Sequence, residues 1–265
     1  MCLIAFDWQP NKPDWLILTA NRDEFYQRPT AALARWSDSP TVVAGRDLEQ
    51  GGTWMGITDA LRFAAVTNIR RPDAPKDKRS RGDLVGGFLN ETRKPADAAR
   101  ELLTQADEYG WFNLLLGTPE SLWYVRNWPE PFISEVAPGV HVLSNEHLDS
   151  PWPKSKLALN QLQQWQQSPA PESLAGLLAH RQSFSDDELP ITGMPVELER
   201  QLSPQFLNLR ERHYGTRSTT SLIGVVGDDG HPLLKIRELG WDDMGKPMGE
   251  VAFEIPRVSR DHLGL

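Results

Sequence analysis

The chain has 265 residues, of which 39% are apolar and 24% charged, as is typical of a globular protein rather than a disordered one. This length fits one large layered domain, so residues 1–265 are expected to form a single domain. The net charge of −8 argues against a general nucleic-acid binder, because neutralising phosphates needs an excess of basic residues.

Strand patterns open the chain. Apolar runs at residues 2–6 and 15–18 flank a proline-rich turn, which predicts a β-hairpin. Residues 54–58 and 61–67 repeat this pattern and predict a second strand pair.

Helices and strands alternate in the rest of the chain. The predicted helices, with apolar residues at three- and four-residue spacing, cover residues 83–91, 95–108, 154–167 and 171–181. The later predicted strands cover residues 112–116, 121–125, 140–143, 218–226, 232–238 and 250–255, with a polar connection over residues 186–204. This order of elements predicts an α+β fold in which two sheets lie between two helical layers.

The sequence carries no clear signal for targeting or metal binding. The N-terminus lacks a basic region followed by a long apolar run, and no window approaches about eighteen apolar residues, so we expect a cytoplasmic protein without an integral membrane segment. A single cysteine excludes an intramolecular disulfide and a cysteine-based metal site. The histidines show no ligand spacing, and no metal or cofactor is expected.

Two groups of residues are candidates for lining a ligand pocket. The ten tryptophans, Trp54 among them, supply apolar area either for the core or for a pocket that binds an apolar ligand. A locally basic segment contains Arg70, Arg71, Lys76, Lys78, Arg79 and Arg81. Such a run is commonly a solvated loop, and the alternative is the rim of a pocket for an anionic ligand.

Cys2 has the most distinctive chemistry in the chain. Removal of Met1 would leave a residue with both a thiol and a free α-amine. That amine, with an ordinary pKa of about 7.7 to 8.0, can act as the general base for a thiol whose pKa is about 8.5. The alternative is that Cys2 is a small buried apolar residue of the first strand.

The second strand of the first hairpin ends in a polar run, Asn21-Arg22-Asp23-Glu24. Antiparallel pairing returns this run to the start of the chain, near Cys2. There Arg22 would favour the thiolate, and Asp23 would anchor the ammonium form of the α-amine. The alternative is a turn cluster with an exposed ion pair.

A series of motifs carries a resemblance to a known family. The motifs are Cys2, ANRDEFYQRP at 20–29, GGTWMGIT at 51–58, TNIRRP at 67–72, SRGDLV at 80–85, LSN at 143–145 and YGTRSTT at 214–220. In this order they resemble the NRDE family, also called the Transport and Golgi organisation protein 2 family. The resemblance implies a four-layer αββα sandwich of the N-terminal-nucleophile (Ntn) hydrolase type, with Cys2 as nucleophile. Residues of these motifs expected to bind the substrate are Asn21, Glu24, Trp54 and Arg81.

The chain also resembles, more distantly, the cholylglycine hydrolase group of penicillin V acylases and bile salt hydrolases. Asn68 and Asn145 resemble two asparagines that assist catalysis there, and Arg217 resembles a late arginine. The resemblance implies that all three converge on the nucleophile, where the amides would stabilise an oxyanion. In those enzymes the arginine precedes the aspartate by three residues. Arg22 and Asp23 are adjacent, so both reach the nucleophile only if the backbone turns between them.

Two functions remain open at this point. The first is hydrolysis of a non-peptide amide or related acyl bond, with Cys2 as nucleophile. The second is a non-catalytic carrier of a haem-like, lipid or acyl ligand on the same fold, because eukaryotic members of the family are linked to Golgi organisation, lipid metabolism and haem movement. Both functions imply a small-molecule partner.

Overall fold

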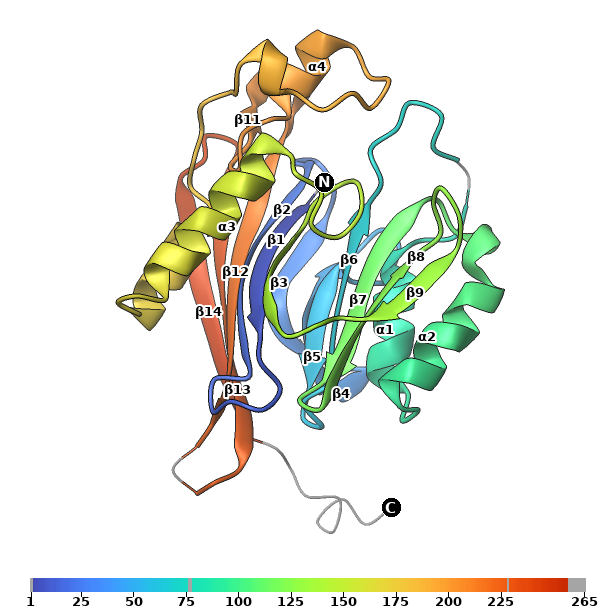
Figure 1. Cartoon of the computed structure of the whole chain (residues 1–265), viewed down its shortest axis with the longest axis vertical. Helices are drawn as coiled ribbons and strands as arrows, with labels where there is room; N and C mark the ends of the chain where they lie inside the picture. The colour runs from blue at the N-terminus through green and yellow to red at the C-terminus, as the bar shows by residue number, and fades with distance from the viewer. Residues whose placement is uncertain (1, 76–77, 228, 257–265) are drawn as a thin grey trace.

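Two antiparallel sheets form the centre of the molecule (Figure 1). The computed structural model describes residues 2–75, 78–227 and 229–256. Sheet A contains, in spatial order, β10 (Gly139–Leu143), β1 (Cys2–Trp8), β2 (Leu16–Phe25), β12 (Tyr214–Val226), β13 (Pro232–Trp241) and β14 (Pro247–Pro256), and β11 (Asn208–Leu209) pairs with β12. Sheet B contains β3 (Thr30–Trp36), β4 (Ser39–Asp47), β5 (Met55–Thr58), β6 (Phe63–Asn68), β7 (Phe112–Thr118), β8 (Ser121–Arg126) and β9 (Phe132–Glu135).

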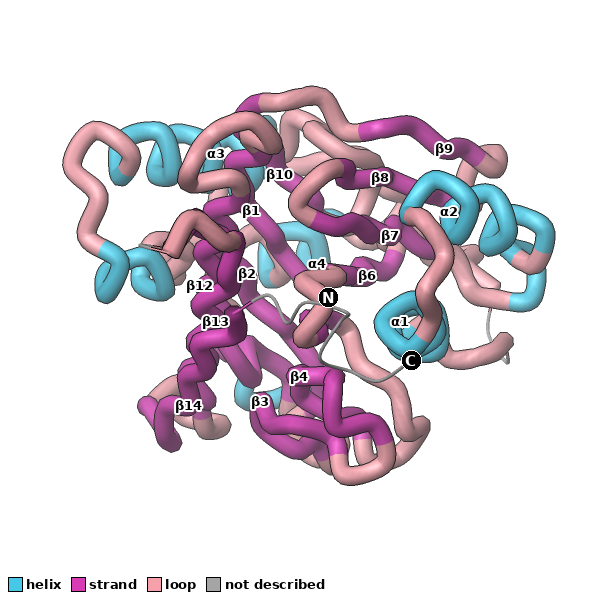
Figure 2. Tube along the Cα trace, turned by 90° about the horizontal axis from the view of Figure 1, so that it is seen from below, coloured by secondary structure: helices cyan, strands magenta, loops and turns pink. Residues whose placement is uncertain are grey.

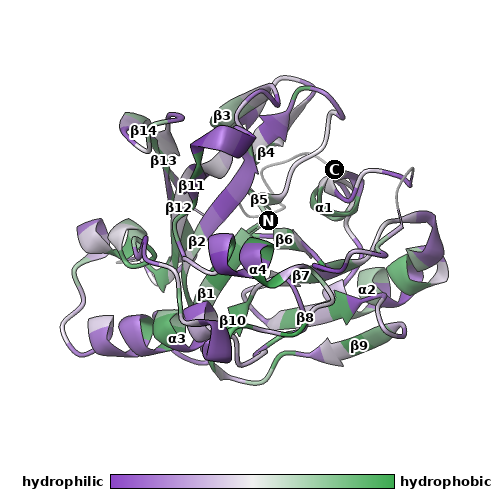
Figure 3. Cartoon of the chain, turned by 90° about the horizontal axis from the view of Figure 1, so that it is seen from above, coloured by the Kyte–Doolittle hydropathy of each residue, from purple (hydrophilic) through white to green (hydrophobic). Residues whose placement is uncertain are grey.

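Helices cover the outer face of each sheet. α1 (Gly82–Asn90) and α2 (Pro95–Thr104) pack on sheet B, whereas α3 (Pro153–Trp165) and the 3₁₀ helix Pro171–Gly176 pack on sheet A. The two groups lie on opposite sides of the molecule (Figure 2). α3 has both hydrophilic and hydrophobic residues (Figure 3), as a helix with one buried face does. The predicted four-layer αββα sandwich is confirmed. α4 (Val196–Gln201) lies at the top of the molecule in Figure 1.

Strand alternation sorts the apolar side chains of β1 into two cores. Ile4 and Phe6 belong to the core between the sheets, whereas Leu3 and Ala5 belong to the core under α3. All residues of β1 are buried, because this strand has neighbours on both sides and layers on both faces. Cys2 begins the strand, and alternation places its side chain on the inter-sheet face, together with Ile4 and Phe6.

The predicted hairpins are present, but three strands of sheet B are not predicted by the sequence analysis. Residues 2–6 and 15–18 fall in β1 and β2, and residues 54–58 and 61–67 largely coincide with β5 and β6. The strands without a prediction are β3, β4 and β9. β3 and β9 lie at the two edges of sheet B and expose many of their residues, so they have no continuous apolar run.

Residues 171–181 differ from the predicted α-helix. Only a 3₁₀ helix forms, and it ends at Gly176. Beyond it, the carbonyl of Leu178 accepts a hydrogen bond from Asn21 Nδ2 at 2.9 Å, and the carbonyl of His180 accepts backbone N–H groups of the segment before β11. These carbonyls are therefore used in tertiary contacts rather than in the bonds of an α-helix.

The predicted absences concern the membrane and metals. Within residues 2–75, 78–227 and 229–256, no helix is both long and apolar enough to cross a bilayer. The same residues contain no cluster of three or more His, Cys, Asp or Glu side chains placed to hold a metal ion. Lys76, part of the basic segment, lies outside the described residues.

Candidate active site

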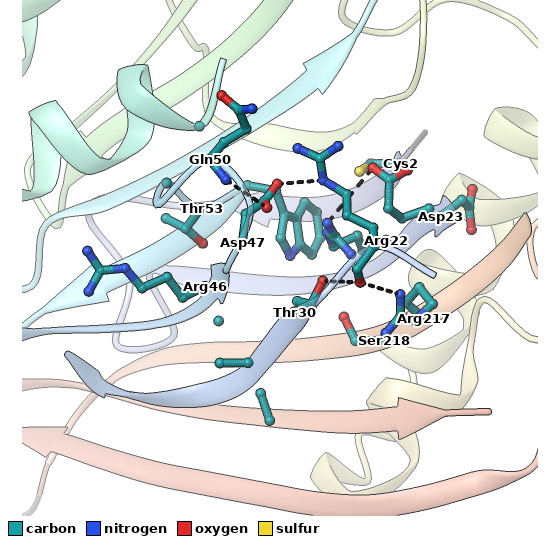
Figure 4. Close-up of a pocket in the computed structure, with 18 of the residues that line it drawn as sticks. Cys2, Arg22, Asp23, Thr30, Arg46, Asp47, Gln50, Thr53, Arg217 and Ser218 are labelled. Carbon is teal, nitrogen blue, oxygen red and sulfur yellow. Dashed lines mark hydrogen bonds and ion pairs between the residues drawn. The ribbon is translucent and has the colours of Figure 1, made fainter. Parts of the chain in front are cut away.

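A cavity of about 870 Å³ opens between the two sheets, and Cys2 borders it. Sheet A contributes residues of β1, β2, β12, β13 and β14, sheet B contributes residues of β3, β4 and β6, and the loops before β5 and α1 complete the wall. The predicted site residues that line it are Cys2, Arg22, Asp23, Glu24, Trp54, Asn68, Arg81 and Arg217. Figure 4 labels Cys2, Arg22, Asp23 and Arg217 among them. Residues far apart in the sequence thus border one cavity, and Asn21 and Asn145 are the predicted site residues that are not in its wall.

Two glycines allow the loops of sheet B to meet at this wall. Gly51 has a φ of +79°, a left-handed conformation that favours glycine. A Cβ atom at Gly52 would lie 2.7 Å from the carbonyl carbon of Gly82, so the loop can touch the start of α1 only without a side chain there. This contact holds Trp54 and Arg81 on neighbouring parts of the wall.

Arg22 is the direct neighbour of Cys2 across the first hairpin. The two residues are partners in the β1–β2 register, so their side chains share the inter-sheet face. Arg22 is 8% exposed and lies 3.9 Å from the carboxylate of Glu24, and its Nη1 atom has no hydrogen-bond partner among the described residues. A buried cation in this position favours the thiolate, which is the role predicted for it.

Asp23 points to the opposite face of sheet A from Arg22. Its Oδ1 atom accepts a hydrogen bond from Thr216 Oγ1 at 2.7 Å. A β-bulge in β12 accompanies this change: Asp23 pairs with Thr216 and Arg22 pairs with Ser218, which leaves Arg217 as the extra residue. Arg22 and Asp23 therefore diverge, as alternation requires, and both still border the cavity (Figure 4).

The bulge places Arg217 in the cavity wall. Its Nη1 atom donates to the backbone carbonyls of Phe25 at 2.8 Å and Arg28 at 3.1 Å, so the guanidinium holds the turn that follows β2. Arg217 has no ion pair with a carboxylate among the described residues.

The two predicted asparagines lie together, but only Asn68 lines the cavity. Its side-chain amide has no hydrogen-bond partner within the described part of the chain. Asn145 is 1% exposed, and its Nδ2 atom donates to the backbone carbonyl of Asn68 at 2.9 Å. The preceding Ser144 donates to the carbonyl of Cys2 at 3.4 Å. Asn145 thus supports the cavity wall from behind.

Asn21 lies on the other face of β2 and does not reach the cavity. Its side chain is fully buried, donates to the carbonyls of Leu178 and Gln205 at 2.9 Å, and accepts from Thr219 at 2.7 Å. The alternation that turns Arg22 toward the cavity turns Asn21 toward the helical layer. These contacts explain a structural role for Asn21, in place of the substrate contact expected from the motif.

The thiol of Cys2 is held in its neutral form. Burial raises the pKa of Cys2 to about 11, and the negative charges of Asp23 and Glu24 act in the same direction. Arg22 acts in the opposite direction. At neutral pH the thiolate is therefore a minor species, and nucleophilic attack needs a base that takes the proton.

A buried lysine near Asp23 is not singled out by the sequence analysis. Lys154 is 2% exposed. Among the described residues its ammonium group makes only one hydrogen bond, a long one of 3.4 Å to the carbonyl of Leu202. Burial lowers the pKa of Lys154 to about 7, Arg70 adds to this effect, and Asp23 opposes it. One signal was available in the sequence: a lysine in the first turn of a predicted helix opposes the helix dipole.

A buried ion pair lies beside this lysine. Arg70 Nη1 is 3.0 Å from Glu199 Oε2, both side chains are almost completely buried, and the Arg70 guanidinium lies 4.3 Å from the ring centre of Trp152. Glu199 comes from α4, so this pair joins α4 to the segment after β6. The basic segment therefore contains at least one arginine that is part of the core.

The sequence of the chain can be compared with those of known proteins. A sequence model of the family described as Transport and Golgi organisation 2 matches residues 1–231. The chain belongs to this family. The Transport and Golgi organization protein 2 homolog of Bos taurus is 32% identical over 254 residues, which cover 87% of this chain and 90% of the bovine protein. The Homo sapiens homolog is 31% identical over 252 residues, with the same coverage of 87% and 90%.

Solved structures with some similarity come from two hydrolases. The Caenorhabditis elegans orthologue of N-acylethanolamine-hydrolyzing acid amidase aligns with a TM-score of 0.47 and 10% identity, over 83% of this chain and 92% of that one. The C2A mutant of the conjugated bile acid hydrolase from Clostridium perfringens aligns with a TM-score of 0.44 and 8% identity, over 96% of this chain and 92% of that one.

Proposed function

We propose that this Transport and Golgi organisation 2 family member is an N-terminal-cysteine hydrolase that cleaves a non-peptide amide or a related acyl bond. The observation that carries the proposal is the position of Cys2. It is the single cysteine of the chain and lies on a central strand, yet it borders a cavity of about 870 Å³ together with Asn68, whose amide has no hydrogen-bond partner among the described residues. A purely structural cysteine does not need a cavity at its side chain.

The proposed reaction begins with removal of Met1, which exposes the α-amine of Cys2. This amine takes the thiol proton, and the thiolate attacks the carbonyl carbon of the substrate, so that a C–S bond forms and the carbonyl electron pair moves to oxygen. The side-chain amide of Asn68 donates a hydrogen bond to this oxyanion. The C–N bond then breaks as the ammonium group returns the proton to the leaving amine. Water, deprotonated by the same amine, hydrolyses the thioester and regenerates the thiol.

The surrounding residues have supporting roles in this scheme. Arg22 stabilises the thiolate, because it is the β-sheet partner of Cys2 and is almost fully buried. Asp23, which accepts a hydrogen bond from Thr216, holds the ammonium form of the new α-amine in this scheme. Asn145 keeps the backbone of Asn68 in place and is a positioning residue rather than an oxyanion donor.

A carrier function is the second candidate, because burial raises the pKa of Cys2 to about 11 and so favours the neutral thiol. In that form the thiol is a poor nucleophile, whereas the cavity can still hold a ligand. The two functions differ in whether Met1 is removed and whether the thiol is needed.

The test combines an N-terminal mass measurement with turnover. We expect protein from its native host to lack Met1 and to hydrolyse at least one member of a panel of acyl amides of 7-amino-4-methylcoumarin. Cys2→Ser should lower kcat by at least about a thousandfold, since the α-amine scarcely deprotonates a hydroxyl. It should keep the same unfolding midpoint. Retained Met1, or turnover that is unchanged in Cys2→Ser, would leave the carrier function as the better account.

A further inference from the structure

Most charged side chains in the cavity wall are paired with charges of opposite sign. Arg28 lies 2.7 Å from Asp47, and Arg79 lies 2.8 Å from Glu108. Arg46 likewise forms an ion pair with an exposed aspartate. Such pairs leave little net field for a ligand.

Two arginines of the wall are exceptions. The guanidinium of Arg81 makes a single hydrogen bond among the described residues, from Nη1 to the carbonyl of Trp111 at 3.4 Å. It has no ion pair among the same residues. Arg217 donates to two backbone carbonyls, lies 5.9 Å from the ring centre of Tyr26 and has no ion pair with a carboxylate among the described residues. Both are partly buried, and burial lowers the pKa of each guanidinium, with Arg28 adding to the effect at Arg81 and Arg22 at Arg217. Glu24 opposes this effect at both arginines, but its carboxylate forms no ion pair with either of them among the described residues.

A third cation adds an unused donor to the same cavity. Nη1 of Arg22 is buried without a hydrogen-bond partner among the described residues, and Arg22 is more than nine-tenths buried. An unmade hydrogen bond of a buried guanidinium is costly unless a ligand completes it. The carboxylate of Glu24 lies 3.9 Å from Arg22, and its charge also acts on Arg81 and Arg217.

We propose that the substrate carries a carboxylate or phosphate group, which Arg81 and Arg217 bind while the scissile carbonyl lies at Cys2. This inference rests on the proposed function for the position of the carbonyl, and on the unpaired arginines for the charge. Arg81 and Arg217 are then specificity-determining residues, and Arg22 supplies the remaining hydrogen bond. Guanidinium groups suit this role because their planar donors match both anions.

The test uses a matched pair of thiol reagents, N-propylmaleimide and maleimidopropionate, which differ in a terminal methyl or carboxylate. Cys2 is the single cysteine, so labelling reports on it alone. The same thiolate attacks both reagents, so the ratio of the two rates does not depend on the pKa of the thiol. The ratio is the rate of labelling by maleimidopropionate divided by the rate of labelling by N-propylmaleimide. We expect this ratio to be roughly three- to tenfold higher for Cys2 than for the free thiol mercaptoethanol. It should fall as salt rises from about 0.05 to about 0.5 M.

Arg81→Gln and Arg79→Gln form the matched variants. Both remove one positive charge from the same loop and both residues line the cavity, but Arg79 already has a partner in Glu108. Arg81→Gln should bring the ratio down to about the value for mercaptoethanol, Arg79→Gln should leave most of the preference, and Arg81→Lys should retain it within about twofold. Circular dichroism checks that each variant is folded. Slower labelling by N-propylmaleimide in the presence of glutarate or of inorganic phosphate identifies which anion is preferred.

The outcomes separate this proposal from the proposed function. A wild-type ratio equal to that of mercaptoethanol, or an equal loss in Arg79→Gln and Arg81→Gln, overturns the anion site whether or not amides are hydrolysed. A raised ratio that depends on Arg81, combined with no turnover in any amide panel, keeps the anion site and overturns the hydrolase. If Arg81→Gln does not fold, the salt dependence in the wild-type protein decides the question.

Discussion

Arg70 and Arg81 belong to the same basic segment, yet their surroundings are opposite in character. Arg70 is buried against Trp152 and paired with Glu199 at 3.0 Å. Arg81 borders the cavity and has no carboxylate partner among the described residues. The comparison teaches that two arginines of one basic segment can differ in whether a carboxylate pairs with them, and the proposed anion site rests on that difference. We call the region around Arg70 and Glu199 the helix side, and the cavity wall around Arg81 the cavity side. β2 lies between them, with Asn21 and Asp23 on its helix side and Arg22 on its cavity side.

The helix side should show the largest effect on stability. Glu199→Gln removes the charge that compensates Arg70 and should lower the free energy of unfolding by about 3 to 5 kcal/mol. Arg81→Gln on the cavity side should change it by no more than about 1 kcal/mol, because no ion pair is lost. Urea unfolding followed by tryptophan fluorescence measures both.

Glu197→Gln is the control within α4. Glu197 pairs with Arg200 at the surface, so its loss should leave the unfolding midpoint unchanged within error. Equal losses for Glu199→Gln and Arg81→Gln would remove the distinction between the two sides.

Lys154 sharpens the comparison through pH. Its pKa falls from 10.5 to about 7 on folding, so between these values the unfolded chain binds more protons than the folded one, and stability rises with pH. The stability that depends on a neutral Lys154 is complete above its pKa in the unfolded chain, and it is lost as the pH falls through its pKa in the folded protein. Lys154→Met should flatten the pH dependence by about 1.4 kcal/mol per pH unit in this window.

Lys156→Met is the matched control for this prediction, because Lys156 follows closely in α3 but is exposed. It should keep the wild-type slope in urea unfolding measured at several pH values between about 7.5 and 9.5. A wild-type slope in Lys154→Met as well would mean that the folded protein does not depress the pKa of this amine.

The smallest expected effect links the two sides. Asp23 raises the pKa of the Cys2 thiol, so Asp23→Asn should lower that pKa and increase the thiolate fraction. Labelling of Cys2 by N-propylmaleimide at pH about 8 should become roughly two- to fivefold faster. Asn can still accept the hydrogen bond from Thr216, so the local structure is retained. Slower labelling in the variant would show that Asp23 acts mainly by ordering the N-terminus.

The sequence supports prediction of elements that have strong apolar periodicity. The first hairpin, α1 and α3 lie close to their expected positions, because each presents a full apolar face to a core. β3 and β9 lie at sheet edges and bury little, so their sequences carry no comparable signal. Residues 171–181 have helical spacing, but tertiary hydrogen bonds to the carbonyls of Leu178 and His180 replace the helix.

The candidate site follows the same rule. Residues next to Cys2 in the hairpin register, such as Arg22, can be placed from strand pairing alone. The motif also predicts a substrate contact for Asn21, because membership of a motif does not show which face of a strand a residue occupies. Glu199 cannot be found from the sequence, and Lys154 has only the weak signal of its place in the first turn of a helix, since the chemistry of both arises from burial by elements distant in sequence. The divergence of Arg22 and Asp23 depends on alternation, which the sequence does supply.

The bulge at Arg217 has a consequence for insertions and deletions in this family. β12 has one residue more than β2 between the partners of Arg22 and Asp23. Deleting that residue would let Thr216 precede Ser218 directly, so that regular pairing keeps Thr216 opposite Asp23 and on the same face. Asp23 would keep its hydrogen-bond donor, but the turn after β2 would lose the guanidinium that holds it. The extra residue of β12 therefore supplies an arginine to the cavity wall without disturbing the pairs on either side, and chain length is part of what encodes the site.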